Sequence, residues 1–277
     1  MLWGASVGPF PPGSETETVF TEHLKNISLI TVREPATADY LRTLGVCDNV
    51  IPCADPAYVV APEITTDPIR ERQRLTLGVN LSPLSALLAG YSVQESIPMQ
   101  ARTLQALITA LDLQVVLIPH VVCKGMKGDD DWRYLQTLRR ALGSPYEGVV
   151  TLLSNDAGFI GTKRELKKCD LVMATRTHCA INALAAHVPT ILVSYSRKAT
   201  GMCQYVYGNS DWTVPLTKFL PESILPMLGR LVGRIDETCG YLAKRVPEIQ
   251  DAAFRPAQAL KDMLAGRATS SGRVTST

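Results

Sequence analysis

The apolar positions in the second half of the chain form short continuous runs, separated by stretches with helical spacing. Continuous apolar runs are typical of strands buried on both faces of a parallel sheet, and amphipathic stretches are typical of the helices between them. The predicted strands cover 75–80, 114–119, 149–152, 171–174 and 190–194, and the predicted helices cover 97–111, 131–142, 158–168 and 180–186. This regular alternation predicts a doubly wound parallel sheet.

The first sixty residues show a shorter version of the same alternation. Residues 2–8 predict a buried strand that runs into a Gly-Pro loop, and two further strands are predicted at 28–32 and 50–52. A helix is predicted over about 37–44, where Gly45 is placed to end it. The opening portion therefore predicts half of a parallel α/β layer.

Composition shifts divide the chain into five segments. Prolines and charges over 62–74 predict a linker. The pattern over 221–264 is helical, with breaks expected near Pro247 and Pro256, and the small, polar and basic end predicts a disordered tail. The predicted segments are a first α/β domain (1–61), the linker (62–74), a second α/β domain (75–215), C-terminal helices (216–265) and the tail (266–277).

Charge and cysteine content exclude several classes of protein. A formal net charge of +2 argues against a broad basic face for nucleic acid. The seven cysteines include no CxxC pair, which predicts free thiols and neither a zinc site nor a disulfide framework. No apolar stretch approaches the roughly 20 residues of a membrane span, and the first ten residues lack the features of a signal peptide. We therefore predict a cytoplasmic protein without an integral membrane segment, whose oligomeric state the sequence does not indicate.

Polar side chains follow two neighbouring predicted strands. The turn 175–178 comes directly after 171–174, and the strand 190–194 runs into Ser194-Tyr195-Ser196-Arg197-Lys198. Ligands in open α/β sheets bind beyond the carboxyl ends of strands, and a helix that begins there favours an anion. Arg176 can hold a carboxylate or phosphate through two hydrogen bonds, His178 can titrate near neutral pH, and Lys198 adds a second cation.

Simpler roles compete for several of these residues. Arg176 can pair with a surface acid and His178 can cap the helix, but the convergence of Arg, His, Ser, Tyr and Lys favours a binding site. For His120, a structural role at a strand end and a role in binding are equally good interpretations. Residues 129–131 predict a solvated loop in which one aspartate caps the following helix, and the basic residues of 163–168 predict a solvated helix face.

The segment from Thr175 to Leu184, followed by Val188-Pro189-Thr190 and 194–198, resembles the signature of the polysaccharide pyruvyl transferases. In that family an Arg-Leu-His-Ala segment precedes a Gly-Val-Pro and a Tyr-Ser-x-Lys. Earlier blocks resemble the family in the same order, at 7–10, 32–35, 44–46, 54–57, 78–80, 118–121 and 129–130. Thr177 stands where Leu is usual, His187 where Gly is usual, and Glu34 where Asp is usual.

The resemblance implies an α/β fold with two Rossmann-like domains of the GT-B type. The family's first strand and its Gly-Asn-x-Gly-Asp loop would precede Val7. Residues 1–61 are therefore expected to be a remnant of the N-terminal domain, so that the first domain is incomplete.

The resemblance also implies an activity. The family uses phosphoenolpyruvate as a co-substrate to place a pyruvate ketal on sugar hydroxyls of a polysaccharide or its lipid-linked precursor, and no other cofactor and no metal are expected. By position, His178 would be the catalytic acid or base. The expected substrate-binding residues are Arg176, Lys198, Arg33, Ser194, Tyr195, Ser196, His120 and Asp55.

Two other functions stay open. One is a GT-B glycosyltransferase or epimerase that uses a nucleotide sugar. Such an enzyme would need a carboxylate clamp for the ribose, whereas Ser194-Tyr195-Ser196 offers hydroxyls. The other is an inactive truncated remnant.

Overall fold

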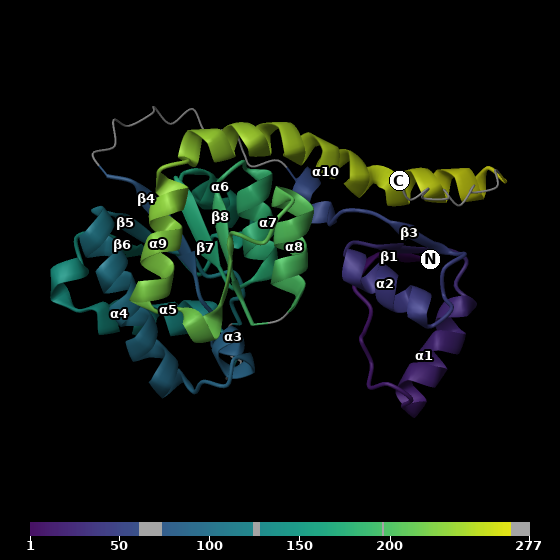
Figure 1. Ribbon diagram of the computed structural model, residues 1–277, viewed down its shortest axis with the longest axis horizontal. Coiled ribbons are helices and arrows are strands. Elements are labelled where there is room, and N and C mark those ends of the chain that lie inside the picture. The colour runs from purple at the N-terminus through teal and green to yellow at the C-terminus, as the bar shows by residue number, and fades with distance from the viewer. Residues whose placement is uncertain (61–73, 124–127, 196, 267–277) are drawn as a thin grey trace. The chain divides into compact units, whose positions relative to one another are not determined.

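The computed structural model describes residues 1–60, 74–123, 128–195 and 197–266. The chain forms two compact units, one from residues 1–59 with the chain from Pro247 onward, and the other from Val60–Val246. Each unit is built on a parallel sheet, so the α/β class is confirmed (Figure 1). The predicted linker and tail fall almost wholly outside the described residues, and the domain boundaries stay a prediction.

The first unit has a three-stranded parallel sheet of order β1-β2-β3. Its core consists of Leu24, Ile30, Val32, Leu41 and Val46. The elements are β1 (Leu2–Ala5), α1 (Glu15–Lys25), β2 (Ile30–Val32), α2 (Pro35–Thr43), β3 (Val50–Pro52) and a short 3₁₀ turn, η1 (Pro56–Val59).

Strand β1 corrects one prediction. It was expected to be buried, but Trp3 is 47% exposed and only Gly4 is buried. The reason is its position: β1 pairs with β2 alone, at the edge of the described sheet. An apolar run therefore does not prove burial on both faces.

The second unit has a six-stranded parallel sheet of order β6-β5-β4-β7-β8-β9. Helix α4 packs against α5 and α9 on one face, and α6 packs against α7 on the other (Figure 1). The strands are β4 (Thr76–Asn80), β5 (Gln114–Leu117), β6 (Val150–Leu152), β7 (Leu171–Ala174), β8 (Thr190–Ser194) and β9 (Thr213–Pro215). The helices are α3 (Pro83–Leu88), α4 (Val93–Leu111), α5 (Asp131–Leu142), α6 (Gly158–Lys167), α7 (Thr177–Ala185), α8 (Arg197–Tyr207) and α9 (Pro221–Val232), with 3₁₀ turns η2 (Ser144–Tyr146) and η3 (Leu216–Lys218).

The strand order creates one switch point. The chain proceeds outward from β4 through β5 to β6, and then returns to place β7 on the other side of β4. In open α/β sheets the ligand crevice lies outside the carboxyl ends of strands at such a point. The central strands β4 and β7 are buried along their whole length, so only their ends are available for a site.

Helix α10 (Ile235–Leu264) corrects a second prediction. Breaks were expected near Pro247 and Pro256, but both prolines lie inside one continuous helix, and the break falls at Gly233, before α10 begins. A proline removes one helical hydrogen bond, but packing of buried side chains can hold a helix across it. Such side chains flank Pro247, at Val246 and Ile249. In the described part of the chain, no helix has both the length and the apolar content that a membrane crossing requires.

Candidate functional site

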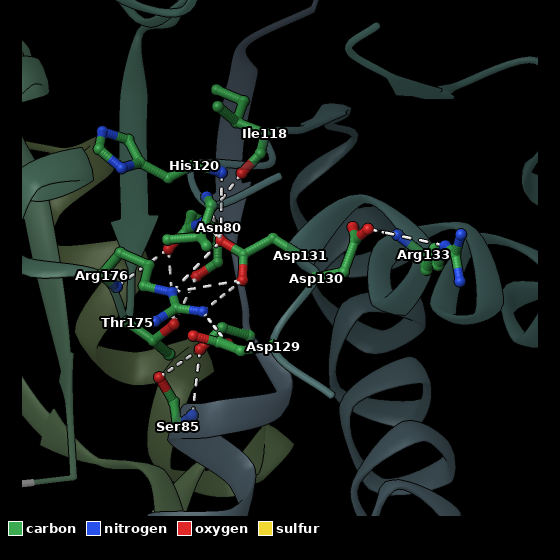
Figure 2. A network of polar contacts seen from close by, with 12 residues as sticks. Asn80, Ser85, Ile118, His120, Asp129, Asp130, Asp131, Arg133, Thr175 and Arg176 are labelled. Atoms are coloured by element: carbon green, nitrogen blue, oxygen red, sulfur yellow. Dashed lines mark hydrogen bonds and ion pairs between the residues drawn. The ribbon is translucent and has the colours of Figure 1, made fainter. Parts of the chain in front are cut away.

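The site lies where β4 and β7 end. Asn80 is the last residue of β4, and Thr175 and Arg176 directly follow β7. The backbone N–H of Arg176 donates to Asn80 Oδ1 at 2.9 Å, and the N–H of Thr175 donates to the Asn80 carbonyl at 3.0 Å. The two strand ends are thus tied together at the switch point of the sheet (Figure 2).

The guanidinium of Arg176 is held by two carboxylates. Its Nη2 donates to Asp131 Oδ1 at 2.8 Å and also contacts Asp129, while its Nε lies 3.3 Å from both Asp131 oxygens. The Arg176 side chain is 11% exposed and that of Asp131 is 0% exposed. Burial disfavours the charge of Arg176, but hydrogen bonds and charges from Asp131 and Asp129 outweigh it and raise the guanidinium pKa.

Asp131 connects three strand ends. Its Oδ2 accepts hydrogen bonds from the backbone N–H groups of His120 (3.1 Å) and Val121 (3.0 Å), and from Asn80 Nδ2 (3.3 Å). His120 and Val121 lie just beyond β5, Asn80 ends β4, and Arg176 follows β7. A buried carboxylate with this many donors is satisfied, so Asp131 stabilises the geometry of the whole edge (Figure 2).

This arrangement bears on the predictions for the aspartates and for Arg176. The neighbouring Asp130 is the N-cap of α5 and accepts from the N–H of Arg133 at 3.1 Å, so the predicted cap is confirmed. The predicted solvated loop is wrong for Asp131, because its carboxylate is 0% exposed and accepts hydrogen bonds from the backbone after β5. Arg176 does pair with a partly exposed acid, Asp129, as its simpler role predicts, but it also pairs with the fully buried Asp131.

His120 lies at the edge of this network. Its ring Nε2 is 3.2 Å from Nδ2 of Asn182, a fully buried residue of α7. Burial, and then the neighbouring His178 and Arg176, lower the pKa of His120 from 6.5 to about 4, so the imidazole is neutral at pH 7. Figure 2 shows the ring directed away from Asp131, which contacts only the backbone of His120.

His178 is exposed in the first turn of α7. Its ring stacks beside that of His120, with centroids 6.5 Å apart and an angle of 12° between the planes. Arg176 is the N-cap of α7 but provides no side-chain hydrogen bond to the first turn. This helix start therefore presents backbone N–H groups, which favour an anion, next to an accessible imidazole.

The other predicted residues of this unit lie at the same edge. Ser194 ends β8, Tyr195 follows it, and both are partly exposed, while Lys198 is exposed near the start of α8. Strand β8 runs parallel to β7 and pairs with it directly, so their carboxyl ends lie side by side. Ser196 lies outside the described residues.

The two predicted residues of the first unit contact each other. Arg33 follows β2, Asp55 follows β3, and Arg33 Nη1 lies 2.8 Å from Asp55 Oδ2. Asp55 Oδ1 also accepts from the backbone N–H of Ala57 at 2.9 Å. The Asp55 side chain is 5% exposed and that of Arg33 is 27% exposed.

The sequence interpretation did not assign four residues of the network to the site: Asn80, Asp129, Asp131 and Asn182. Asn80 carried a usable signal, since it is a polar residue at the end of an apolar run, in the position that ligands approach. The predicted solvated basic face is also wrong for Lys163, which is fully buried. Burial lowers the pKa of Lys163 to about 8, and its Nζ lies 6.0 Å from the centroid of the Phe159 ring.

Comparison with solved structures shows the fold. The chain is similar to S. aureus MnaA in a co-structure with UDP (14% identity, TM-score 0.60, 86% of this chain and 61% of that chain). It is also similar to an α,α-trehalose-phosphate synthase (UDP-forming) from Burkholderia vietnamiensis (11%, 0.57, 92% and 64%) and to a glycosyltransferase from Rickettsia africae (8%, 0.58, 94% and 69%). The chain thus spans less than two thirds of the length of the first two proteins. The expected α/β fold of the GT-B type is confirmed.

Comparison of sequences shows the family. No curated protein matches the chain. The family model of polysaccharide pyruvyl transferase matches residues 1–197, which include both predicted polar clusters up to Arg197. The chain therefore belongs to the polysaccharide pyruvyl transferase family.

Proposed function

We propose that this protein transfers a pyruvyl group from phosphoenolpyruvate to sugar hydroxyls of a polysaccharide or its lipid-linked precursor, forming a ketal. The observation that carries the proposal is the pair of imidazoles at the edge of the six-stranded sheet. His178 is exposed on the first turn of α7, and the neutral His120 stacks beside it at 6.5 Å. Family membership supplies the reaction class.

The reaction requires two proton movements that a titratable imidazole can serve. One sugar hydroxyl adds through its oxygen to C2 of phosphoenolpyruvate, while C3 receives a proton and becomes a methyl group. A second hydroxyl of the same sugar then bonds to C2 as the C2–O bond to phosphate breaks, and its proton leaves with the phosphate side. The products are the cyclic ketal and inorganic phosphate. His178 is the proposed acid and base for these transfers.

Phosphoenolpyruvate carries a phosphate and a carboxylate, so anion recognition must accompany the proton transfer. The backbone N–H groups at the start of α7 and the exposed Lys198 are the proposed anion-binding groups, with Ser194, Tyr195 and Ser196 as further ligands. Arg176 has its charge balanced by Asp131 and Asp129, so its proposed role is mainly to position the start of α7. Arg33 and Asp55 stay candidate binding residues of the first unit.

The proposal is tested with the full chain, phosphoenolpyruvate and a panel of methyl glycosides as acceptors. Phosphate release and the new ketal methyl signal in the NMR spectrum are measured together. We expect His178→Gln to lower kcat by about 100-fold or more. Binding of phosphoenolpyruvate, measured by calorimetry, should change little. His23→Gln, at an exposed position of α1, is the matched control and should keep full activity.

Unchanged turnover in His178→Gln would refute the proposed role of this imidazole. A second assay replaces phosphoenolpyruvate with UDP-N-acetylglucosamine and tests the other candidate function. Release of UDP in this assay, without phosphate release from phosphoenolpyruvate, would indicate a nucleotide-sugar enzyme of the same fold. UDP in the MnaA co-structure is the reason to include this arm. Turnover with neither donor would favour the inactive remnant.

A further inference from the structure

Asn182 is the polar residue among the buried side chains of α7 from Cys179 to Ala185. A buried amide costs stability when its groups are unpaired, roughly 1–3 kcal/mol for each group. Asn182 is 0% exposed, and its Nδ2 lies 3.2 Å from Nε2 of His120. This contact gives a reason for an amide at a position where packing alone would favour an apolar residue.

The same face of α7 contacts His120 twice. His178 and Asn182 are four residues apart, so they lie one helical turn apart on one side of the helix. The His178 ring stacks beside that of His120 with centroids 6.5 Å apart, and Asn182 contacts the Nε2 edge of the same ring. The backbone N–H of His120 is held by Asp131 at 3.1 Å. Both the main chain and the ring of His120 are thus fixed before a ligand binds.

The contact with Asn182 also determines where the His120 ring carries its proton. Burial, and then His178 and Arg176, lower the pKa of His120 to about 4, so at pH 7 the neutral ring has one proton, on Nδ1 or on Nε2. The amide presents Nδ2 to the ring, and this nitrogen can only donate. Nε2 must therefore accept, which leaves the single proton on Nδ1.

We propose that Asn182 is a positioning residue for the pyruvyl transfer, which holds the proton of His120 on Nδ1. The role in the reaction rests on the proposed function, whereas the tautomer does not. Because Nε2 is engaged by Asn182, His120 acts as a hydrogen-bond donor through Nδ1, and the proton transfers are left to His178. His120 is partly exposed and lines a cavity of about 540 Å³ at the carboxyl ends of β5 and β6, which gives a reactant access to its ring.

The test reads the tautomer directly. The full chain is labelled with ¹⁵N, and the shifts of the two ring nitrogens of His120 are measured at pH 7, since a nitrogen with a proton and one without differ widely in shift. The signals are assigned by their loss in His120→Asn. We expect the proton on Nδ1 in the wild type. In Asn182→Leu, which has nearly the same size and lacks the donor, the proton should distribute over both nitrogens.

Turnover measures the consequence for the reaction. Asn182→Leu should lower kcat roughly 10–100-fold and leave KM for phosphoenolpyruvate nearly unchanged, because a placed donor is lost while the anion-binding groups stay. Asn182→Ala is the second variant if leucine does not fit the position. Asn209→Leu, at an exposed position after α8, is the matched control and should keep both the tautomer and kcat.

A wild-type His120 with its proton on Nε2 would overturn the inference, because the amide would then accept through Oδ1. An unchanged tautomer in both Asn182 variants would also overturn it, since another group would then hold the proton. Unchanged kcat in a variant whose tautomer has shifted would refute the role in the reaction. Failure of the proposed function gives a different result: Asn182 would still determine the tautomer, while neither the wild type nor the variants would release phosphate from phosphoenolpyruvate.

Discussion

Each of the two parallel sheets has an arginine paired with an aspartate where its strands end, and the surroundings of the two pairs differ. The shortest contact is 2.8 Å in both, between Arg33 and Asp55 in the first unit and between Arg176 and Asp131 in the second. Arg33 is 27% exposed, whereas Arg176 is 11% exposed. The distance alone thus does not distinguish the two pairs.

The pair in the second unit is more deeply buried, and its aspartate connects several elements. Asp131 accepts from the main chain after β5, from Asn80 of β4 and from Arg176 after β7. Asp55 forms an ion pair with Arg33 and accepts a hydrogen bond from the nearby N–H of Ala57. An ion pair that joins three strand ends determines the shape of a site. We infer that Arg176 and Asp131 hold His120 and His178 in place, a role distinct from that of an anion ligand.

The largest effect should come from removing the charge at the centre of the second network. Asp131→Asn leaves Arg176 partly uncompensated in a buried position, which should cost about 3–5 kcal/mol of stability. Urea unfolding measures the loss, and hydrogen exchange at the amides of His120 and Val121 locates it. Full protection of these two amides in the variant would contradict the role given to Asp131.

Acid should destabilise the second unit through His120. Between pH 6.5 and 4, the unfolded chain carries a proton on this imidazole that the folded chain does not, so stability falls as the pH is lowered through this window. Above pH 6.5 this group contributes no pH dependence. The lowered pKa of His120 corresponds to at most roughly 3–4 kcal/mol. Urea unfolding at pH 7 and pH 4.5 measures this loss of stability. His120→Asn should lose less stability between the two pH values than the wild type does. Equal losses in both proteins would contradict the role given to His120.

A smaller effect is expected from the matching change in the first unit. Asp55→Asn removes the charge that pairs with a more exposed arginine, and should cost about 1.5–3 kcal/mol. The amides of His120 and Val121 should keep their protection, since their acceptor is Asp131. A loss as large as that of Asp131→Asn would remove the distinction between the two pairs.

The sequence predicted the strands of the second unit well because their apolar runs are unambiguous, as at 171–174. It did not predict α3, α8 or β9, which carry short or mixed patterns. Helix α8 (Arg197–Tyr207) begins with small and polar residues, so the segment gives little apolar spacing to detect. Helix α10 continues through two prolines because packing of buried neighbouring side chains compensates for the helical hydrogen bonds that the prolines remove. The local sequence pattern does not reveal this packing.

The sequence predicted only those residues of the candidate site that directly follow a single strand. His178 and Lys198 were proposed as site residues because ligands bind at the residues that follow a buried strand. Asp131 was read as a solvated residue because three consecutive aspartates usually face water. Its burial depends on contacts with the backbone after β5 and with Arg176 after β7, and Asp131 and Arg176 lie 45 residues apart in the sequence. Contacts of this range follow from the strand order, which periodicity does not give.

The most direct test of the account uses the four histidines of the chain as internal probes. Imidazole ¹³C–¹H NMR signals are followed while phosphoenolpyruvate is added to the full chain at pH 7. The account predicts that the His178 signals shift most and those of His120 shift less. The signals of His23 and His187, which lie on α1 and after α7, should stay unchanged. Saturation with phosphoenolpyruvate that leaves His178 unperturbed would contradict the placement of the reaction at the edge of the six-stranded sheet.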